Sequence, residues 1–566
     1  MKILFKKDDI MYLLTVLTLV LFLYLPNLMN NFVNWDDYEM ILKDPILTEF
    51  SISNIKNILT AHFSFKYCRI VPLAYISYAF DHHFFGHNPY IYHLTQTLFH
   101  LLNVCLVFLF TRLLLKNAHI SFITSLLFAL HPINVEPVAW ISARAHVLFV
   151  FFYLISLISY LFSENNQNFR LLTLIAFFLS LLSCSFAITL PCVLLLIDYH
   201  KAGKIDAQKI IDKIPFFLLS LFFGLLTIWA AKYSAEISDP FLTTKYYSFA
   251  SRMGLSLTAI YIYLSKFILP ISLCGIYPIN YYINKNLIFA IFGIMALFLF
   301  LKQPGIKESR NTWFCLLFFF ITTFPFLHMF GVNETIISER YMYLPSISLF
   351  MATALVFHFL INHNNPVLFQ LRYFMTGCLI AFVGILLMQS YLRLQVWRNG
   401  ETFWSDVIAQ NPRLTPAYLS RGRYYLTENN PGFASRDFRK AIELDPHNVY
   451  AHKNLGHSYL YKGNIEQAQH SYATAILIDP VNPSHYTDRG NAFFLMRKYA
   501  DALKDYDRAL RLDTDHTASR LNRGVLLQQM QEYEKALNDF YHVLTIDPAN
   551  EMAIDNINKI NNLLGI

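Results

Sequence analysis

Residues 449–482 read VYAHKNLGHSYLYKGNIEQAQHSYATAILIDPVN, and the blocks before and after them repeat the same pattern of small and turn-forming residues. A glycine recurs at every thirty-fourth position, at Gly422, Gly456, Gly490 and Gly524. An alanine recurs with the same step, at Ala434, Ala468, Ala502 and Ala536. Turn pairs follow the step as well, at Asn411-Pro412, Asp445-Pro446, Asp479-Pro480, Asp513-Thr514 and Asp547-Pro548. The C-terminal part of the chain is therefore one structural unit copied several times.

This period and these residue types are typical of the tetratricopeptide repeat, in which two helices form each unit. Small residues let the two helices approach closely, and Pro ends a unit because it cannot continue a helix. We expect an α-solenoid of four repeats, at 415–448, 449–482, 483–516 and 517–550. A linker at 401–414 is expected before the repeats, and a capping helix at 551–566 after them.

The first 400 residues have a different composition. The chain of 566 residues is 55% hydrophobic and 16% aromatic but only 15% charged. Residues 401–566 hold 18 Lys+Arg and 20 Asp+Glu, so much of the charge lies outside the apolar part. By subtraction from 45 and 38, residues 1–400 hold 27 basic and 18 acidic side chains. Basic residues beside membrane spans explain this excess, so a nucleic acid is disfavoured as a partner.

Apolar runs long enough for membrane helices recur through residues 1–400. The first, from Ile10 to Trp35, lacks charge and follows Lys2, Lys6 and Lys7, and we expect it to be a membrane span rather than a cleaved signal peptide. The further runs lie at 91–111, 119–135, 146–162, 171–197, 214–231, 253–271, 287–301, 312–330, 344–361 and 373–391. We expect an all-α chain in which a polytopic helical membrane domain at 1–400, with about eleven spans, precedes the solenoid.

The distribution of Lys and Arg indicates a topology. Loops containing Arg112, Lys201 to Lys213, and Lys302 to Arg310 are expected in the cytoplasm. The opposite face then receives the C-terminal tail and the segments 31–90, 131–145, 233–252 and 331–343. The run 171–197 lies between two internal loops, so we expect the stretch 183–185 and Pro191 to divide it into two short helices.

Two neighbouring carboxylates, Asp36 and Asp37, follow the first expected span. A carboxylate at a membrane surface can accept a proton from a hydroxyl nucleophile or hold a cation. The alternative is that both side chains only cap the next helix.

Further polar residues stand in or beside the spans. His93, Gln96, His100 and Asn103 share one helical face, which suits either a ligand or hydrogen bonds to other helices. Arg69 and Arg144 could hold a phosphate through the guanidinium fork, or contact lipid headgroups. His131 and Glu136 could be ligands or a capping pair, and Glu339 and Arg340 could form a local salt bridge.

Several familiar sites are absent from the sequence. It has no Gly-rich phosphate loop, no Ser-centred nucleophile elbow and no His-Glu-x-x-His zinc helix. All seven Cys precede residue 400 without the spacing of a metal knuckle, and we interpret them as small hydrophobic residues. Charged mid-span residues and repeated span patterns, which a transporter would predict, are also not evident.

An ordered set of motifs resembles the transmembrane and tetratricopeptide-repeat O-mannosyltransferase-like family. These motifs are WDD after the first span, FFGHNPYIYHLTQTLFH, LFALHPINVEPVAWISAR, ISERYMYLPS and the repeats. The resemblance covers nearly the whole chain and implies the GT-C membrane glycosyltransferase fold. It also implies inverting transfer of a sugar, typically mannose, from a polyprenyl- or dolichyl-phosphate carrier to Ser or Thr hydroxyls of a protein held in the repeat groove.

The resemblance implies roles for individual residues. Asp36 and Asp37 match the acidic pair, with Asp36 as the general base. The residues implied for donor binding are Arg69, His93, His100, His131, Glu136, Arg144, Glu339 and Arg340. No cofactor beyond the lipid-linked sugar is implied, and a requirement for a divalent cation stays open. The active face and the repeats would be periplasmic in a bacterial inner membrane, or lumenal in the endoplasmic reticulum of a eukaryote.

The chain departs from the family pattern at two places. His146 stands where an Asp is common, and Cys184 and Ser185 stand where a Lys-Glu pair is usual. Losing an Asp and a Lys together could remove a structural ion pair at little energetic cost, or could alter the donor pocket or abolish activity. A non-catalytic, membrane-anchored scaffold is therefore the alternative function.

Overall fold

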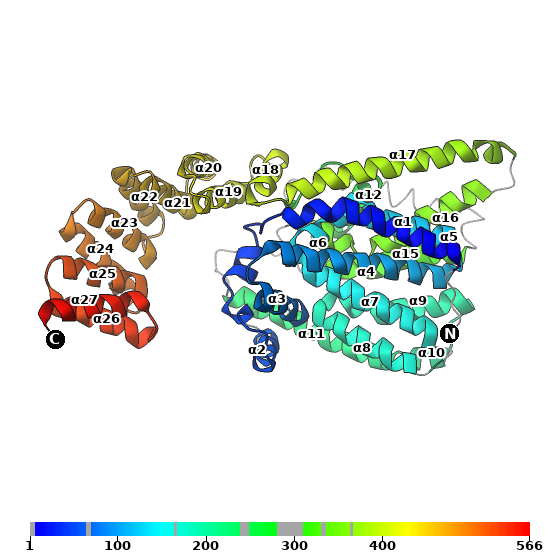
Figure 1. The fold of residues 1–566 in the computed structure, drawn as a ribbon, viewed down its shortest axis with the longest axis horizontal. Helices are drawn as coiled ribbons and strands as arrows, with labels where there is room; N and C mark the ends of the chain where they lie inside the picture. Colours follow the sequence, from blue (N-terminus) through cyan, green and yellow to red (C-terminus); the bar gives the residue numbers. More distant parts are fainter. Residues whose placement is uncertain are drawn as a thin grey trace. The chain divides into compact units, whose positions relative to one another are not determined.

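The computed structural model describes residues 6–63, 70–163, 166, 168–237, 248–279, 309–329, 335–362 and 366–565. Within these ranges all regular elements are helices, and one isolated bridge joins Pro278 to Thr335. The chain divides into two compact units, residues 1–403 and 404–566. Each unit is described by itself (Figure 1).

Five described helices of the first unit are long and apolar enough to cross a membrane. They are Lys7–Met29 (α1 with η1), Pro89–Leu115 (α4), Ile141–Ser163 (η5 with α7), Ser185–Ala202 (η6 with α9) and Arg372–Val396 (within α17). A sixth span is formed if Ala118–Leu130 (α5) and Pro132–Ala139 (η4 with α6), bent by 59°, count as one. Shorter apolar helices are Asn168–Ser183 (α8), Ile214–Ala230 in α11 and Ser346–Ile361 in α16. The run 287–301 lies outside the described residues, so the total of about eleven stays a prediction.

The full bounds of the other elements of this unit are as follows. The helices are α2 (Ile52–Phe63), α3 (Pro72–Phe85), α10 (Ala207–Ile211), α11 (Ile214–Ile237), α12 (Phe249–Ile268), α15 (Arg310–Thr323), α16 (Ser346–Asn362) and α17 (Pro366–Val396). Short turns are η2 (Tyr38–Leu42), η3 (Pro45–Leu47), η7 (Phe324–Phe326) and η8 (Glu339–Met342).

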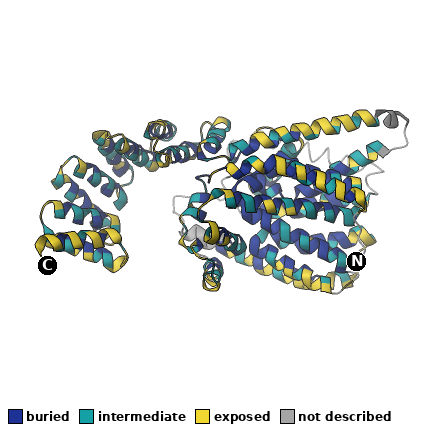
Figure 2. Ribbon diagram, viewed as in Figure 1, coloured by how far each residue is buried: buried dark blue, intermediate teal, exposed yellow. Residues whose placement is uncertain are grey.

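Helix α4 illustrates why these sequences form a bundle. Asn88 caps it by accepting a hydrogen bond from the backbone N–H of Tyr90, and Pro89 occupies the first turn, where no N–H is needed. Its polar face is buried against α5 and α7, whereas Leu98 and Leu102 are exposed. Polar groups inside and apolar groups outside are what a lipid solvent requires. In Figure 2 the exposed residues likewise follow the outer sides of α1 and α17.

The expected division of the run 171–197 is confirmed. Helix α8 ends at Ser183, the turn η6 occupies Ser185–Thr189, and α9 begins at Leu190 with Pro191 in its first turn. Pro is tolerated there because the first turn of a helix has no internal N–H bond to lose.

The second unit is a row of helix pairs. The pairs are α19 (Thr415–Thr427) with α20 (Pro431–Leu444), α21 (Val449–Tyr461) with α22 (Ile465–Ile478), α23 (Pro483–Leu495) with α24 (Tyr499–Leu512), and α25 (Thr517–Gln529) with α26 (Tyr533–Ile546). Helix α27 (Glu551–Leu564) follows the last pair. The segment 401–414, expected as a linker, is mostly occupied by α18 (Gly400–Gln410). The recurring alanines Ala434, Ala468, Ala502 and Ala536 are fully buried, as close helix packing requires.

Candidate functional site

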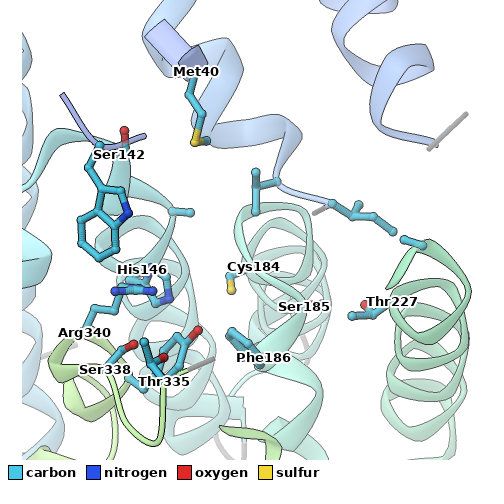
Figure 3. A pocket seen from close by; sticks show the side chains of 16 residues that line it. Met40, Ser142, His146, Cys184, Ser185, Phe186, Thr227, Thr335, Ser338 and Arg340 are labelled. Atoms are coloured by element: carbon cyan, nitrogen blue, oxygen red, sulfur yellow. The ribbon is translucent and has the colours of Figure 1, made fainter. Parts of the chain in front are cut away.

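A cavity of about 370 Å³ lies in the first unit, among segments that are far apart in sequence (Figure 3). The loop after α1 contributes Trp35 and Met40, and the start of α7 contributes His146. The break before α9 contributes Cys184 and Ser185, and η8 contributes Arg340 and Tyr341. We call this space the Arg340 cavity, because among its described lining residues only Arg340 carries a fixed charge.

Arg340 is buried and held in place by one carboxylate and several rings. Its Nη1 donates to Glu136 Oε1 at 2.7 Å, and its guanidinium lies 5.1 Å from the Trp140 ring centre and 5.0 Å from that of Tyr341. A carboxylate and aromatic faces both stabilise a cation away from water. The charge of Asp36 also acts on Arg340. Arg340 therefore brings a guanidinium to the cavity, with the Glu136 carboxylate beside it as its counter-charge.

The two candidate catalytic carboxylates have different surroundings. Asp37 is buried, and its oxygens accept hydrogen bonds from Val33 N at 2.9 Å, from Ser142 N at 3.0 Å and from Ser142 Oγ. Burial raises the pKa of Asp37 from 3.8 to about 6, against the lowering effect of these hydrogen bonds. Asp37 thus connects the loop after α1 to η5. Asp36 is only partly buried, and it follows Trp35 in the chain without being one of the described residues that line the Arg340 cavity.

Arg144 lies among polar partners from the chain itself. It is fully buried, and its Nη1 donates to Asp81 Oδ2 at 2.5 Å and to Ser77 Oγ at 2.9 Å. Its Nη2 donates to the carbonyl of Tyr92, and the ring of Tyr78 lies under the guanidinium at 4.6 Å. Arg144 forms a buried ion pair with Asp81 and does not line the Arg340 cavity, so phosphate binding by Arg144 stays a prediction. Asp81 is not among the predicted site residues, although a buried Arg implies a carboxylate partner.

The polar face of α4 serves contacts between helices. Gln96 Nε2 donates to the carbonyls of Pro137 and Trp140, and Asn103 Nδ2 donates to that of Val147. His100 Nδ1 and Tyr343 Oη are 2.7 Å apart, and His93 Nδ1 lies 3.4 Å from Asn27 Nδ2. None of the four residues of this face lines the Arg340 cavity, and their contacts are those of the hydrogen-bonding alternative, so ligand binding by His93 and His100 stays a prediction.

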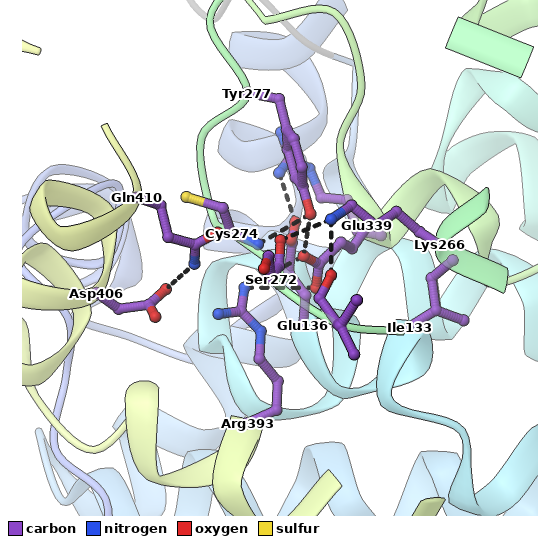
Figure 4. A network of polar contacts seen from close by, with 12 residues as sticks. Ile133, Glu136, Lys266, Ser272, Cys274, Tyr277, Glu339, Arg393, Asp406 and Gln410 are labelled. Carbon is purple, nitrogen blue, oxygen red and sulfur yellow. Dashed lines mark hydrogen bonds and ion pairs between the residues drawn. The ribbon is translucent and has the colours of Figure 1, made fainter. Parts of the chain in front are cut away.

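His131 and Glu339 also have structural partners. His131 Nδ1 accepts from the backbone N–H of Ile133 and so begins the turn η4, and its Nε2 lies 3.0 Å from the carbonyl of Phe267. Glu339 Oε1 accepts from Tyr277 Oη at 2.8 Å and lies 3.3 Å from Nη2 of Arg393 (Figure 4).

The network around Glu339 includes residues that were not predicted from the sequence. Lys266 Nζ donates to the carbonyls of Ile271 and Ser272, and its charge acts on Glu339. Tyr277 Oη accepts from the backbone N–H of Cys274. Nothing in the local sequence of Lys266, Tyr277 or Arg393 indicates this assembly, since its members come from three distant segments, 266–277, Glu339 and Arg393. Glu339 and Arg340 are thus neighbours in sequence that take different partners, Arg393 and Glu136.

The three residues that depart from the family pattern lie around the same cavity. His146, Cys184 and Ser185 all line the Arg340 cavity (Figure 3). Arg69 lies outside the described residues, and the following Ile70 and Val71 line the cavity. In the part of the chain that the structure describes, no group of three or more His, Cys, Asp or Glu side chains could hold a metal ion.

The chain is similar to known proteins in its repeats and, over a longer stretch, to a protein O-mannosyl-transferase. Tetratricopeptide-repeat family models match residues 415–448, 438–470, 484–516 and 517–550. The protein O-mannosyl-transferase F38B6.6 of Caenorhabditis elegans is 25% identical over 469 residues, covering 78% of this chain and 64% of that protein. The human protein O-mannosyl-transferase TMTC2 is 39% identical over 90 residues, covering 16% of this chain and 11% of that protein. A crystal structure of MamA covers 25% of this chain and 84% of its own, with 24% identity and a TM-score of 0.24.

These matches differ in extent. The chain spans less than two thirds of the length of the Caenorhabditis elegans relative, and the human relative is matched over a short segment.

Proposed function

Because the chain is a relative of the tetratricopeptide-containing protein O-mannosyl-transferases, we propose that it is an integral membrane glycosyltransferase. It transfers a sugar, mannose in the simplest case, from a polyprenyl- or dolichyl-phosphate carrier to Ser or Thr hydroxyls of a protein. The reaction takes place on the non-cytoplasmic face, where the positive-inside bias puts Asp36 and Arg340. The repeats bind the protein acceptor.

The Arg340 cavity is the observation that carries this proposal. Its volume of about 370 Å³ falls within the usual range for small-molecule sites, about 300–1,000 Å³. A buried guanidinium fits a phosphate that bears negative charge, and Arg340 is already oriented by Glu136. Glu136 acts through Arg340 and is therefore a positioning residue. The donor phosphate is bound beside Arg340, with the sugar in the same cavity.

The chemistry then requires little more than a base and the exclusion of water. The carboxylate of Asp36 takes the proton of the acceptor hydroxyl, whose oxygen forms a bond to the anomeric carbon. The bond between that carbon and the carrier phosphate oxygen breaks, the configuration inverts, and the lipid phosphate leaves with the electron pair. Arg340 stabilises the charge that grows on the departing phosphate. Asp37, which accepts three hydrogen bonds, keeps the loop carrying Asp36 in place.

Sugar transfer by the purified full-length protein tests this proposal. The protein is incubated with labelled polyprenyl-phosphate sugars and candidate acceptor proteins, and label on the protein is counted. We expect Asp36→Asn to lower the rate roughly 10²- to 10⁴-fold, because a general base is lost. Glu39→Gln is the matched control, since Glu39 is an exposed carboxylate three residues away that pairs with Lys43. Full activity of Asp36→Asn would remove Asp36 as the base.

A membrane-anchored scaffold is the second candidate, and one observation favours it. The positions where the family usually has charges are His146, Cys184 and Ser185 here, and all three line the Arg340 cavity. If no donor supports transfer while the repeats still retain a protein partner, the scaffold function is correct.

A further inference from the structure

Three of the four repeats contain the same internal ion pair. An arginine in the first helix of the pair donates two hydrogen bonds to an aspartate sixteen residues later. The pairs are Arg421 with Asp437, Arg489 with Asp505, and Arg523 with Asp539, with N···O distances of 2.7–2.8 Å. Such two-pronged contacts are the strongest form of this ion pair.

Aromatic side chains flank two of these guanidinium groups. In the third repeat, Arg489 lies 5.9 Å from the ring centre of Tyr486 and 5.8 Å from that of Phe493. In the first repeat, Arg421 lies 6.0 Å from the ring centre of Tyr425. The site in the third repeat is therefore a cradle for a planar cation, with rings at its sides and a carboxylate at its end.

The second repeat has ring side chains at these positions but lacks the ion pair. Leu455 stands at the position of the arginine and Ser471 at that of the aspartate. His452 and Tyr459 stand at the positions of Tyr486 and Phe493. These four residues line a groove of about 510 Å³ formed by α20, α21 and α22. Both members of the ion pair are replaced together, so no buried charge is left without its counterpart.

Two hydroxyl groups and one carboxylate of this groove can accept hydrogen bonds from a ligand. Ser471 Oγ donates to the carbonyl of Gln467 at 2.9 Å and Thr474 Oγ1 to that of His470 at 3.2 Å, which leaves their lone pairs for a donor. Glu466, exposed at the rim, supplies a carboxylate where the third repeat has Ala500. A guanidinium has five donors and no acceptor, so it complements this set. We define the repeat-2 cradle as His452, Leu455, Tyr459, Glu466, Ser471 and Thr474.

We propose that the repeat-2 cradle binds the guanidinium of an arginine side chain presented by another protein. The incoming arginine occupies the place that Arg489 fills in the third repeat, between Tyr459 and His452 and beside Glu466. Arg439 also lines the groove, at its rim. Its positive charge opposes that of the incoming arginine. This binding requires no step of sugar transfer, so its test is independent of the proposed enzyme activity.

The test measures binding of labelled peptides to the full-length protein in detergent by fluorescence polarisation. The probe is Gly-Ser-Arg-Ser-Gly, and its counterparts carry Lys, citrulline or Glu at the centre. We expect the Arg peptide to bind roughly tenfold more tightly than the citrulline peptide, because the uncharged analogue loses the cation–aromatic and carboxylate contacts. The Lys peptide should lie between the two. Equal binding of the Arg and citrulline peptides, or tighter binding of the Glu peptide, would overturn the proposal.

A refilled cradle provides the matched control. The double variant Leu455→Arg with Ser471→Asp copies the pair of the other repeats and should reduce binding of the Arg peptide to the level of the citrulline peptide. Glu466→Gln should weaken binding of the Arg peptide several-fold. Because Glu466 is exposed, this substitution should leave the fold intact. Arg439→Ala should strengthen it. Binding that is unchanged in both the double variant and Glu466→Gln, or that appears only after Arg439→Ala, would contradict the proposal.

Discussion

Arg144 and Arg340 show how the same residue type takes different roles. Both are buried. Arg144 is a candidate phosphate ligand by its residue type and place in the sequence, and the family resemblance implies donor binding for Arg340 too. Arg144 is saturated by Asp81, Ser77 and the Tyr92 carbonyl, which leaves no side of the guanidinium for a ligand. Arg340 has one carboxylate partner and lines a cavity. The number of partners within the chain, rather than burial, separates the structural arginine from the candidate ligand.

The buried ion pair gives a prediction at the residue scale. Arg144→Gln should lower the free energy of unfolding by about 3–5 kcal/mol, because Asp81 is left as an unpaired buried charge. Replacing both, as Arg144→Met with Asp81→Leu, should recover most of this loss. Thermal unfolding in detergent measures both effects. Lys43→Ala, which breaks an exposed pair with Glu39, is the control and should cost less than about 1 kcal/mol.

A different outcome would support donor binding by Arg144. If Arg144→Gln keeps the melting temperature of the unaltered protein but loses donor binding, Arg144 is a ligand after all.

At the scale of elements, each repeat has a glycine in its first helix that packs against an aromatic ring of its second helix. A Cβ on Gly456 would lie 2.5 Å from Cε1 of Tyr472, and one on Gly490 would lie 2.7 Å from Cε1 of Tyr506. Gly422 and Gly524 meet Phe438 and Phe540 in the same way. The recurring glycines are therefore explained by close approach of two helices, not by an unusual backbone conformation.

A pair of glycine substitutions tests this explanation. Gly456→Ala should destabilise its helix pair by about 1–3 kcal/mol, because the Tyr472 ring must move. Gly432→Ala is the control: nothing lies within 4 Å of its Cβ, and it should be neutral or stabilising by up to about 1 kcal/mol. Hydrogen exchange of the amides in α21 and α22, followed by mass spectrometry, reports the change. Equal protection in both variants would mean that the ring moves freely.

At the scale of the whole molecule, charge and exposure divide the chain into a part for lipid and a part for water. In the first unit, large apolar side chains such as Leu14, Phe22 and Leu225 are exposed on helices whose polar residues point inward. In the repeats, the exposed faces carry the charged residues and the alanines are inside. These opposite patterns follow from the solvent that each unit meets.

Thiol labelling tests the topology of the whole molecule. The repeats have no Cys, so Glu551→Cys places one exposed thiol in the tail. We expect it to react with a membrane-impermeant reagent in intact cells or spheroplasts, because the charge bias puts the tail outside the cytoplasm. Lys204→Cys, in a loop expected inside, should react only after the membrane is opened. The reverse pattern would invert the topology and remove Asp36 from the proposed active face.

Patterns that repeat over a few turns of chain were readable without a structure. The 34-residue step predicted the helix pairs and their buried alanines, and the stretch around Cys184 predicted the break between α8 and α9. These features depend on neighbours in sequence, whose spacing is set by helix geometry. The alternation of apolar runs and basic loops likewise indicated a membrane domain.

Which polar groups meet was decided only by the tertiary structure. Arg144 pairs with Asp81, which lies 63 residues away in the sequence, and Asp37 accepts hydrogen bonds from Ser142, which lies 105 residues away. Arg340 pairs with Glu136, which lies 204 residues away in the sequence. Local sequence cannot specify such pairs, because they result from the packing of helices that are distant in the chain. The same holds for the repeat-2 cradle: the sequence contains Leu455 and Ser471, but only the folded repeats place them where the other repeats hold a guanidinium.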